Sequence, residues 1–134
     1  ATTEIYTLSL HDALPIFLWL LYKPQNITKS TEQIIQTAEY VGVSIITLWE
    51  LATKHKLGKL RFSTEDLLEG IKAIEFPLLL CQPNHIIALK HINLPHKDPF
   101  DTLLIAQAKA EGLVLLTADK QLLDSSYKTI DARK

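Results

Sequence analysis

Acidic residues in this sequence recur at positions where carboxylates can act together. Five of them follow a predicted strand or open a predicted helix: Asp12, Glu50, Asp98, Asp101 and Asp119. In α/β folds, ligands bind beyond the carboxyl ends of parallel strands, so these side chains are expected to approach one another. Carboxylates gathered in one place repel each other unless a hard divalent cation neutralises them, and oxygen ligands favour Mg²⁺ or Mn²⁺. The pattern therefore predicts a divalent metal site.

A metal site of this kind would suit hydrolysis of a phosphodiester, because the cation activates water and no Ser, Lys or Cys nucleophile is needed. A simpler interpretation stays open from the residues alone. Capping and the helix dipole favour acidic side chains near the start of any helix. This accounts individually for four of the five: Glu50, Asp98, Asp101 and Asp119. A phosphatase with an aspartyl nucleophile is less favoured, since it needs an Asp-x-Asp pair where only Asp12 stands.

The elements that must position these residues alternate between strands and helices. β-forming or apolar runs predict strands at residues 5–10, 43–46, 78–81, 113–116 and 129–130. Capping residues and the spacing of apolar side chains predict helices at residues 15–22, 28–40, 47–58, 63–75, 84–91 and 101–111. This alternation indicates an α/β fold, a sandwich around a mostly parallel sheet with right-handed crossovers.

Individual side chains of these helices carry further expectations. Thr47 is expected to cap the helix that contains Glu50. Trp49 lies in an apolar stretch and is expected in the core rather than on the surface as a platform for a nucleic-acid base. Ile86, Ile87 and Leu89 are expected to turn inward from their helix.

A basic stretch follows Glu50 and has two interpretations. It consists of Lys54, His55, Lys56, Lys59 and Arg61. These cations could contact RNA phosphates. They could equally be a solvated helix end whose positive charges complement the helix dipole. The sequence alone leaves both interpretations open.

Length and composition limit the remaining possibilities. The chain has 134 residues, which predicts one domain over 1–134. Its formal charge is 14 basic minus 15 acidic residues, or −1, so nucleic-acid contacts must be local. The single cysteine, Cys81, excludes an internal disulfide. The most apolar run, residues 14–22, is too short for a bilayer, which needs about 20 residues, so we expect a cytoplasmic protein without a membrane segment.

Three segments together resemble a known family. They are FLWLLYKP (residues 17–24), SIITLWELATKHKLGKL (44–60) and HKDPFDTLLIAQAKAEGLVLLTAD (96–119). In this order they resemble the PIN-domain ribonucleases, specifically the VapC-type toxins of toxin-antitoxin pairs. The similarity runs from about Ile16 to the end of the chain.

The resemblance implies a three-layer α/β/α PIN-like fold whose clustered acids hold Mg²⁺ or Mn²⁺ and cleave RNA. The family's metal-binding acids match Glu50, Asp101 and Asp119, while Asp98 takes a supporting catalytic role and Thr117 accompanies the site. The implied partners are an RNA substrate, a small antitoxin protein whose tail blocks the site, and a second copy of the toxin in a homodimer.

The amino terminus departs from the family pattern. Members normally open with an apolar strand that runs into Leu-Asp-Thr-His, whereas this chain has His11-Asp12-Ala13 one residue further from Trp19. The chain contains no methionine, and residues 4–16 resemble a peptide that adapter read-through introduces into metagenomic gene models. We therefore expect residues 1–16 to be atypical, with Asp12 as a provisional metal ligand. The alternative function is a catalytically impaired PIN fold that only binds a protein partner, because its first metal-ligand aspartate is lost.

Overall fold

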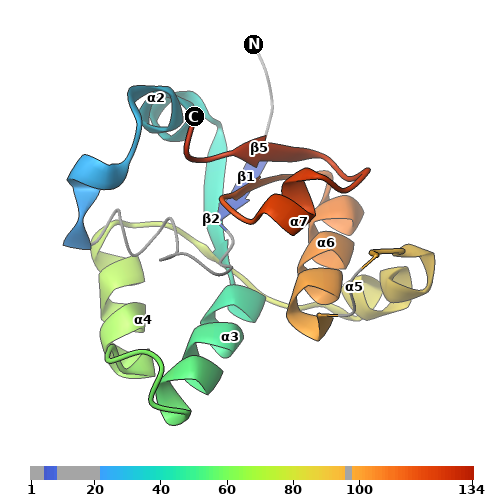
Figure 1. Cartoon of the computed structure of the whole chain (residues 1–134), viewed down its shortest axis with the longest axis horizontal. Helices are drawn as coiled ribbons and strands as arrows, with labels where there is room; N and C mark the ends of the chain where they lie inside the picture. The colour runs from blue at the N-terminus through green and yellow to red at the C-terminus, as the bar shows by residue number, and fades with distance from the viewer. Residues whose placement is uncertain (1–4, 9–21, 96–97) are drawn as a thin grey trace.

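A computed structural model describes residues 5–8, 22–95 and 98–134 of the chain (Figure 1). Its strands form one five-stranded sheet, in the order β3 (Leu78–Leu79), β2 (Tyr40–Ser44), β1 (Ile5–Leu8), β4 (Val114–Thr117) and β5 (Thr129–Asp131). All four neighbouring pairs of these strands are parallel. The predicted parallel sheet is therefore confirmed, with β1 at its centre.

Helices connect the strands as parallel pairing requires. The helices are α2 (Lys29–Thr37), α3 (Ile45–Lys56), α4 (Thr64–Ala73), α5 (Pro83–Ala88), α6 (Pro99–Glu111) and α7 (Lys120–Leu123). Two short 3-10 turns accompany them, η1 (Pro24–Asn26) and η2 (Leu89–His91). The predicted helices that begin after residue 22 thus reappear, together with α7, which the sequence did not indicate. The helix predicted at residues 15–22 lies, except for residue 22, outside the described residues.

The predicted boundaries around β2 are wrong. The strand predicted at residues 43–46 spans Tyr40–Ser44. The helix predicted through residue 40 ends at Thr37, because Tyr40 pairs with Ile5 at the start of β2. The helix predicted from Thr47 begins earlier, since the Ser44 side chain accepts the Ile46 N–H at 3.0 Å and caps α3. Strand β2 therefore passes directly into α3 without a loop.

The sheet carries a hydrophobic core on each face. Successive residues of a strand point to opposite faces. Leu116 packs in a cluster with Val43, Leu48 and Leu67, whereas its neighbour Leu115 packs in a second cluster with residues of α3, α6 and α7. Because both faces are covered by helices, the molecule has the predicted three-layer α/β/α architecture (Figure 1).

Strand β2 contains a glycine at a position where a side chain would clash with a neighbouring residue. Tyr40 and Gly42 lie two residues apart and so face the same side of the sheet. A Cβ added to Gly42 would meet the Tyr40 hydroxyl at 2.6 Å and ring carbon Cε1 at 2.7 Å. We expect Gly42→Ala to lower the free energy of unfolding by about 1–3 kcal/mol, the usual cost of overpacking. Denaturant unfolding measures this change.

The control for this prediction is the same Gly42→Ala substitution in a Tyr40→Ala protein. In a Tyr40→Ala protein the clashing ring is absent, so the added methyl group should cost little. Equal losses of stability in the two backgrounds would contradict the explanation, because the cost would then come from the strand itself.

Candidate functional site

Three of the predicted acidic residues are almost completely buried. The exposed fractions are 6% for Glu50, 0% for Asp101 and 3% for Asp119. Each belongs to a different element: Glu50 to α3, Asp101 to the first turn of α6, and Asp119 to the turn that follows β4. Burying a carboxylate is costly unless a partner compensates its charge. Their burial therefore distinguishes these acids from ordinary solvent-exposed acids at helix starts.

The sheet places two of these acids at the same edge. Strands β2 and β4 both pair in parallel with β1, so their carboxyl ends lie on one side of the molecule. Glu50 lies in the helix that continues from β2, and Asp119 lies two residues beyond the end of β4. This edge is where ligands bind in sheets of this class.

An aromatic contact brings the third acid to this edge. The rings of Trp49 and Phe100 meet edge to face, with centroids 4.5 Å apart. Trp49 precedes Glu50 in α3, and Phe100 precedes Asp101 in α6. The contact therefore fixes the first turn of α6 beside the middle of α3. Trp49 itself is 51% exposed, so the prediction that it lies in the core is wrong.

Buried hydrogen bonds join α6 to the end of β2, from which α3 continues. The Ser44 hydroxyl donates to Oε1 of Gln107, and both side chains are fully buried. The Gln107 amide donates in turn to the carbonyl oxygens of Leu79 and Leu80, at 3.4 and 3.2 Å. Gln107 thus joins β2, α6 and the end of β3. Gln107 was not predicted from the sequence, where its signal is an uncharged polar residue within the apolar run LLIAQA of α6.

Two of the predicted acids also cap helices. One Asp98 carboxylate oxygen accepts the N–H groups of Phe100 and Asp101, at 2.9 and 3.3 Å. Asp119 Oδ1 accepts the Gln121 N–H at 3.0 Å, and the Asp119 N–H donates to the Thr117 hydroxyl at 3.0 Å. The capping interpretation therefore holds for both residues. Capping also fixes where these side chains lie, which a ligand site requires.

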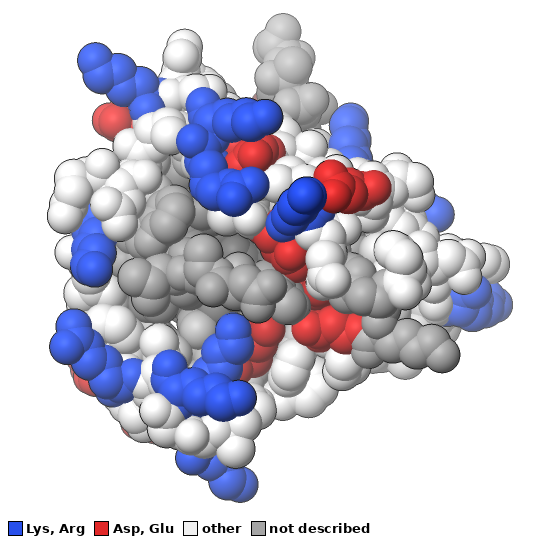
Figure 2. Space-filling model, viewed as in Figure 1, with Lys and Arg blue, Asp and Glu red and all other residues white. Residues whose placement is uncertain are grey.

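The described residues do not by themselves form a complete metal site. Within the described ranges, no three His, Cys, Asp or Glu side chains meet the geometry for holding a metal ion. Asp12, the provisional additional ligand, lies outside these ranges. The donor chemistry nevertheless fits a hard cation, since the buried acids offer only carboxylate oxygens. Figure 2 shows acidic side chains gathered near the middle of one face, with Lys and Arg side chains around them.

A basic side chain touches this acidic group. Lys54 Nζ lies 3.9 Å from Glu50 Oε2, one turn along α3. This is a long contact to a partly exposed lysine, so its contribution to stability is small. It does place the basic stretch of α3 directly beside the acids.

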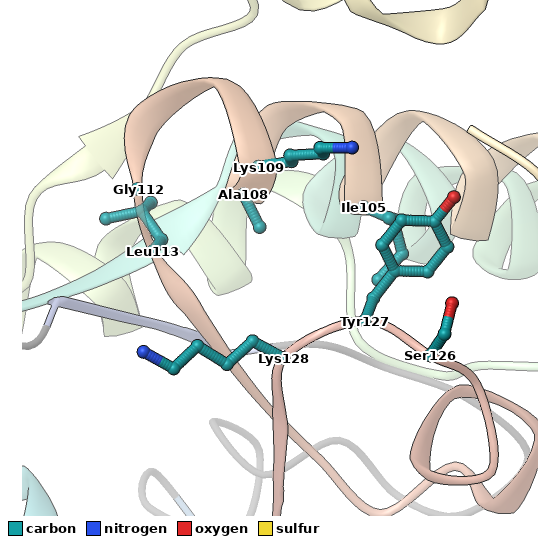
Figure 3. Close-up of a pocket in the computed structure, with 8 residues that line it drawn as sticks. All are labelled: Ile105, Ala108, Lys109, Gly112, Leu113, Ser126, Tyr127 and Lys128. Atoms are coloured by element: carbon teal, nitrogen blue, oxygen red, sulfur yellow. The ribbon is translucent and has the colours of Figure 1, made fainter. Parts of the chain in front are cut away.

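A pocket of about 540 Å³ lies at the other end of α6 (Figure 3). Its lining includes Lys109, Leu113, Tyr127 and Lys128, and none of the predicted acids that the structure describes. Lys109 Nζ lies 5.8 Å from the centre of the Tyr127 ring, whose hydroxyl accepts the Asn93 N–H at 2.8 Å. This pocket is therefore separate from the carboxyl edge of the sheet where Glu50, Asp101 and Asp119 lie, which we call the acidic edge.

The amino-terminal edge of the sheet holds a second polar group that the sequence did not indicate. Buried His85 accepts the Gln82 N–H at Nδ1, which leaves its proton on Nε2 to donate to Glu111 at 2.6 Å. Burial and the charge of Glu111 raise the pKa of Tyr40 above its usual value. These residues fasten α5 to α6 at the edge opposite the acids.

The surface of α5 also differs from expectation. Ile86 and Ile87 are exposed rather than turned inward, and Leu80 is exposed as well. Leu89 packs against the second hydrophobic cluster, as predicted. Helix α5 contacts α6 through its other side, where His85 and Ala88 lie. In the ranges that the structure describes, no helix is long and apolar enough to cross a membrane.

Solved structures share this fold along almost the whole chain. VapBC2 from Rickettsia felis, crystallised with a promoter DNA fragment, matches with a TM-score of 0.63 and 16% identity, covering 95% of this chain and 98% of that chain. DNA-bound VapBC from Salmonella typhimurium matches at 0.62 and 17%, covering 97% and 98%. VapBC-1 from nontypeable Haemophilus influenzae matches at 0.62 and 16%, covering 97% and 99%.

Sequence comparison points in the same direction as these structures. No curated protein matches the chain significantly. The sequence profile of the PIN domain, however, matches residues 15–125, well over half of the chain and a range that contains the three buried acids. The chain therefore belongs to the PIN domain family.

Proposed function

We propose that this protein is a metal-dependent endoribonuclease that acts in the cytoplasm as the toxin of a toxin-antitoxin pair. The observation that carries the proposal is the burial of Glu50, Asp101 and Asp119 at the carboxyl edge of a parallel sheet. PIN membership supports nuclease chemistry, and the VapBC structures that share the fold support the toxin assignment. The reaction proposed is hydrolysis of an RNA phosphodiester bond.

The proposed mechanism assigns a role to each acid. Glu50, Asp101 and Asp119 would hold Mg²⁺ or Mn²⁺, with Asp12 as a further candidate ligand. A bound cation of this type supplies a lowered pKa for attacking water and neutralises charge that develops on phosphate oxygens. Asp98 caps α6 and so fixes the turn that presents Asp101; it is a positioning residue. No nucleophilic side chain of the protein is required, because water attacks the phosphorus.

The proposed partners are an antitoxin and a second copy of the chain. The structural neighbours are VapBC assemblies, which favours a small antitoxin protein as partner. Leu80, Ile86 and Ile87 expose apolar surface around α5, which suits a protein interface better than contact with water. We include a homodimer in the proposal on this ground.

Removal of divalent metal tests the proposed reaction. Purified protein should cleave RNA in the presence of Mg²⁺ or Mn²⁺, lose cleavage when a chelator is added, and regain it when either ion is restored in excess. Gel analysis of a labelled RNA measures each state. Cleavage that persists unchanged in the chelator would contradict the metal mechanism, and binding of a protein partner without any cleavage would favour the binding-module alternative.

A further inference from the structure

A second pocket, about 430 Å³ in volume, lies where α3 ends. Its lining includes three cationic side chains, and no acidic residue is among the described residues that line it: Lys23, Gly58, Lys59, Leu60, Arg61 and Phe62. We call it the basic pocket. In a protein whose net charge is −1, this local concentration of positive charge points to an anionic ligand.

The loop that carries the basic pocket has a fixed conformation. The His55 ring donates from Nδ1 to the Leu60 carbonyl at 2.7 Å, because a carbonyl oxygen can only accept. Gly58 has a φ of 75°, which glycine adopts without strain, and the Lys59 N–H donates back to the Lys54 carbonyl at 2.8 Å. The backbone of Lys59 and its neighbours is therefore already in place before any ligand binds.

Aromatic contacts support the cations of the basic pocket. Arg61 Cζ lies 5.3 Å above the centre of the Phe62 ring. The Phe62 ring also stacks on Tyr22, with centroids 4.4 Å apart and ring planes 8° from parallel. A guanidinium held over a ring keeps its N–H groups for other partners, and its planar geometry suits bidentate contacts to phosphate oxygens.

The position of the basic pocket relates it to the acidic edge. Glu50 lies in α3 and the basic pocket lies just beyond the end of this helix, and the seven residue steps from Glu50 to Leu57 span roughly 10 Å along the helix axis. Lys54 lies between them and contacts Glu50. Figure 2 shows Lys and Arg side chains over the lower parts of α3 and α4, to one side of the acidic centre. A strand of a few nucleotides could therefore reach both sites.

We propose that the basic pocket binds a phosphodiester of single-stranded RNA, distinct from the phosphodiester that is cleaved. Lys23, Lys59 and Arg61 contact its anionic oxygens, and the fixed loop holds Lys59 and Arg61 in register with α3. The inference deepens the proposed function, since it assigns the path of the RNA strand away from the acidic edge.

The test measures RNA affinity at several salt concentrations, with cleavage prevented by Asp101→Asn and metal-free buffer. The probe is a labelled oligouridylate of about 12 nucleotides. The test variant is Lys59→Gln with Arg61→Gln, two exposed positions; the control, Lys109→Gln with Lys128→Gln, removes the same charge from the pocket of Figure 3. Each phosphate contact on single strands contributes about 0.7 to the slope of log affinity against log salt.

The expected result is a slope reduced by about 1.4 in the test variant and hardly changed in the control. Probes with single neutral methylphosphonate linkages should show one position that weakens binding to the parent but not to the test variant. Equal slopes in the two variants, or no measurable RNA binding by the parent, would overturn the inference. A polyglutamate peptide serves as a second probe. If the test variant loses affinity for this peptide but not for RNA, the pocket belongs to a protein partner and the inference is also overturned.

Failure of this inference is distinguishable from failure of the proposed function. If the protein cleaves RNA but the salt dependence of its RNA affinity is independent of Lys59 and Arg61, the proposed function stands and the proposed RNA path is wrong. If the protein binds RNA through these residues but does not cleave it with Mg²⁺ or Mn²⁺, the proposed RNA path stands and the proposed reaction is wrong.

Discussion

Replacement of Asp101 by asparagine is expected to reduce RNA cleavage by more than about 100-fold. Asp101 is fully buried in the first turn of α6, so the amide can occupy the same space while the negative charge is removed. Substitution of a residue that hydrogen-bonds to a metal ligand already lowers metal affinity or activity about 10–100-fold, and loss of a ligand has a larger effect. Initial rates of cleavage at saturating Mg²⁺ measure the effect.

A matched control for this prediction is Asp66→Asn. Asp66 occupies the same position in the first turn of α4, three residues after the cap, but it is exposed. Both substitutions remove a similar interaction with a helix dipole, worth about 0.3–1 kcal/mol. Only Asp101→Asn should affect cleavage. Equal activity of the two variants would show that Asp101 serves the helix and not the reaction.

Replacement of Gln107 by leucine is expected to lower the free energy of unfolding by about 2–4 kcal/mol. Leucine has a similar volume but cannot accept from the Ser44 hydroxyl or donate to the Leu79 and Leu80 carbonyls. Each buried polar group left without its partner costs about 1–3 kcal/mol. Thermal and denaturant unfolding measure the loss.

Two further variants separate the hydrogen bonds of Gln107 from its position in the helix. Gln36→Leu makes the same change on the exposed face of α2 and should leave stability nearly unchanged. Ser44→Ala completes a double-mutant cycle. It also removes the cap of α3, but because Ser44 and Gln107 share a hydrogen bond, the loss of stability in the double variant should be smaller than the sum of the two single losses. A Gln107→Leu protein as stable as the parent would contradict the role given to this residue.

Much of the fold follows from local sequence pattern. Apolar β-branched runs and capped helices alternate along the chain, and this alternation is enough to predict a parallel α/β sheet. The acids Glu50, Asp101 and Asp119 were identified because each follows a strand or opens a helix, and burial distinguishes them from simple capping residues. Their role as metal ligands stays a prediction.

Features that depend on contacts distant in sequence were not predicted. The pairing of Tyr40 with Ile5 decides where β2 starts, and helical spacing around residue 40 contains no trace of it. The apolar stretch around Trp49 predicts a core residue, yet its side chain is half exposed and its ring meets Phe100, a residue distant in sequence. Ile86 and Ile87 face outward because buried His85 takes the inner side of α5.

Crystals of the full chain grown with Mn²⁺ would test the central claim most directly, since anomalous scattering locates manganese independently of other density. The account predicts a peak within about 2.5 Å of carboxylate oxygens from Glu50, Asp101 and Asp119, and no such peak in Asp101→Asn crystals. Manganese bound elsewhere, or no manganese at the carboxyl edge of the sheet at saturating concentration, would contradict it.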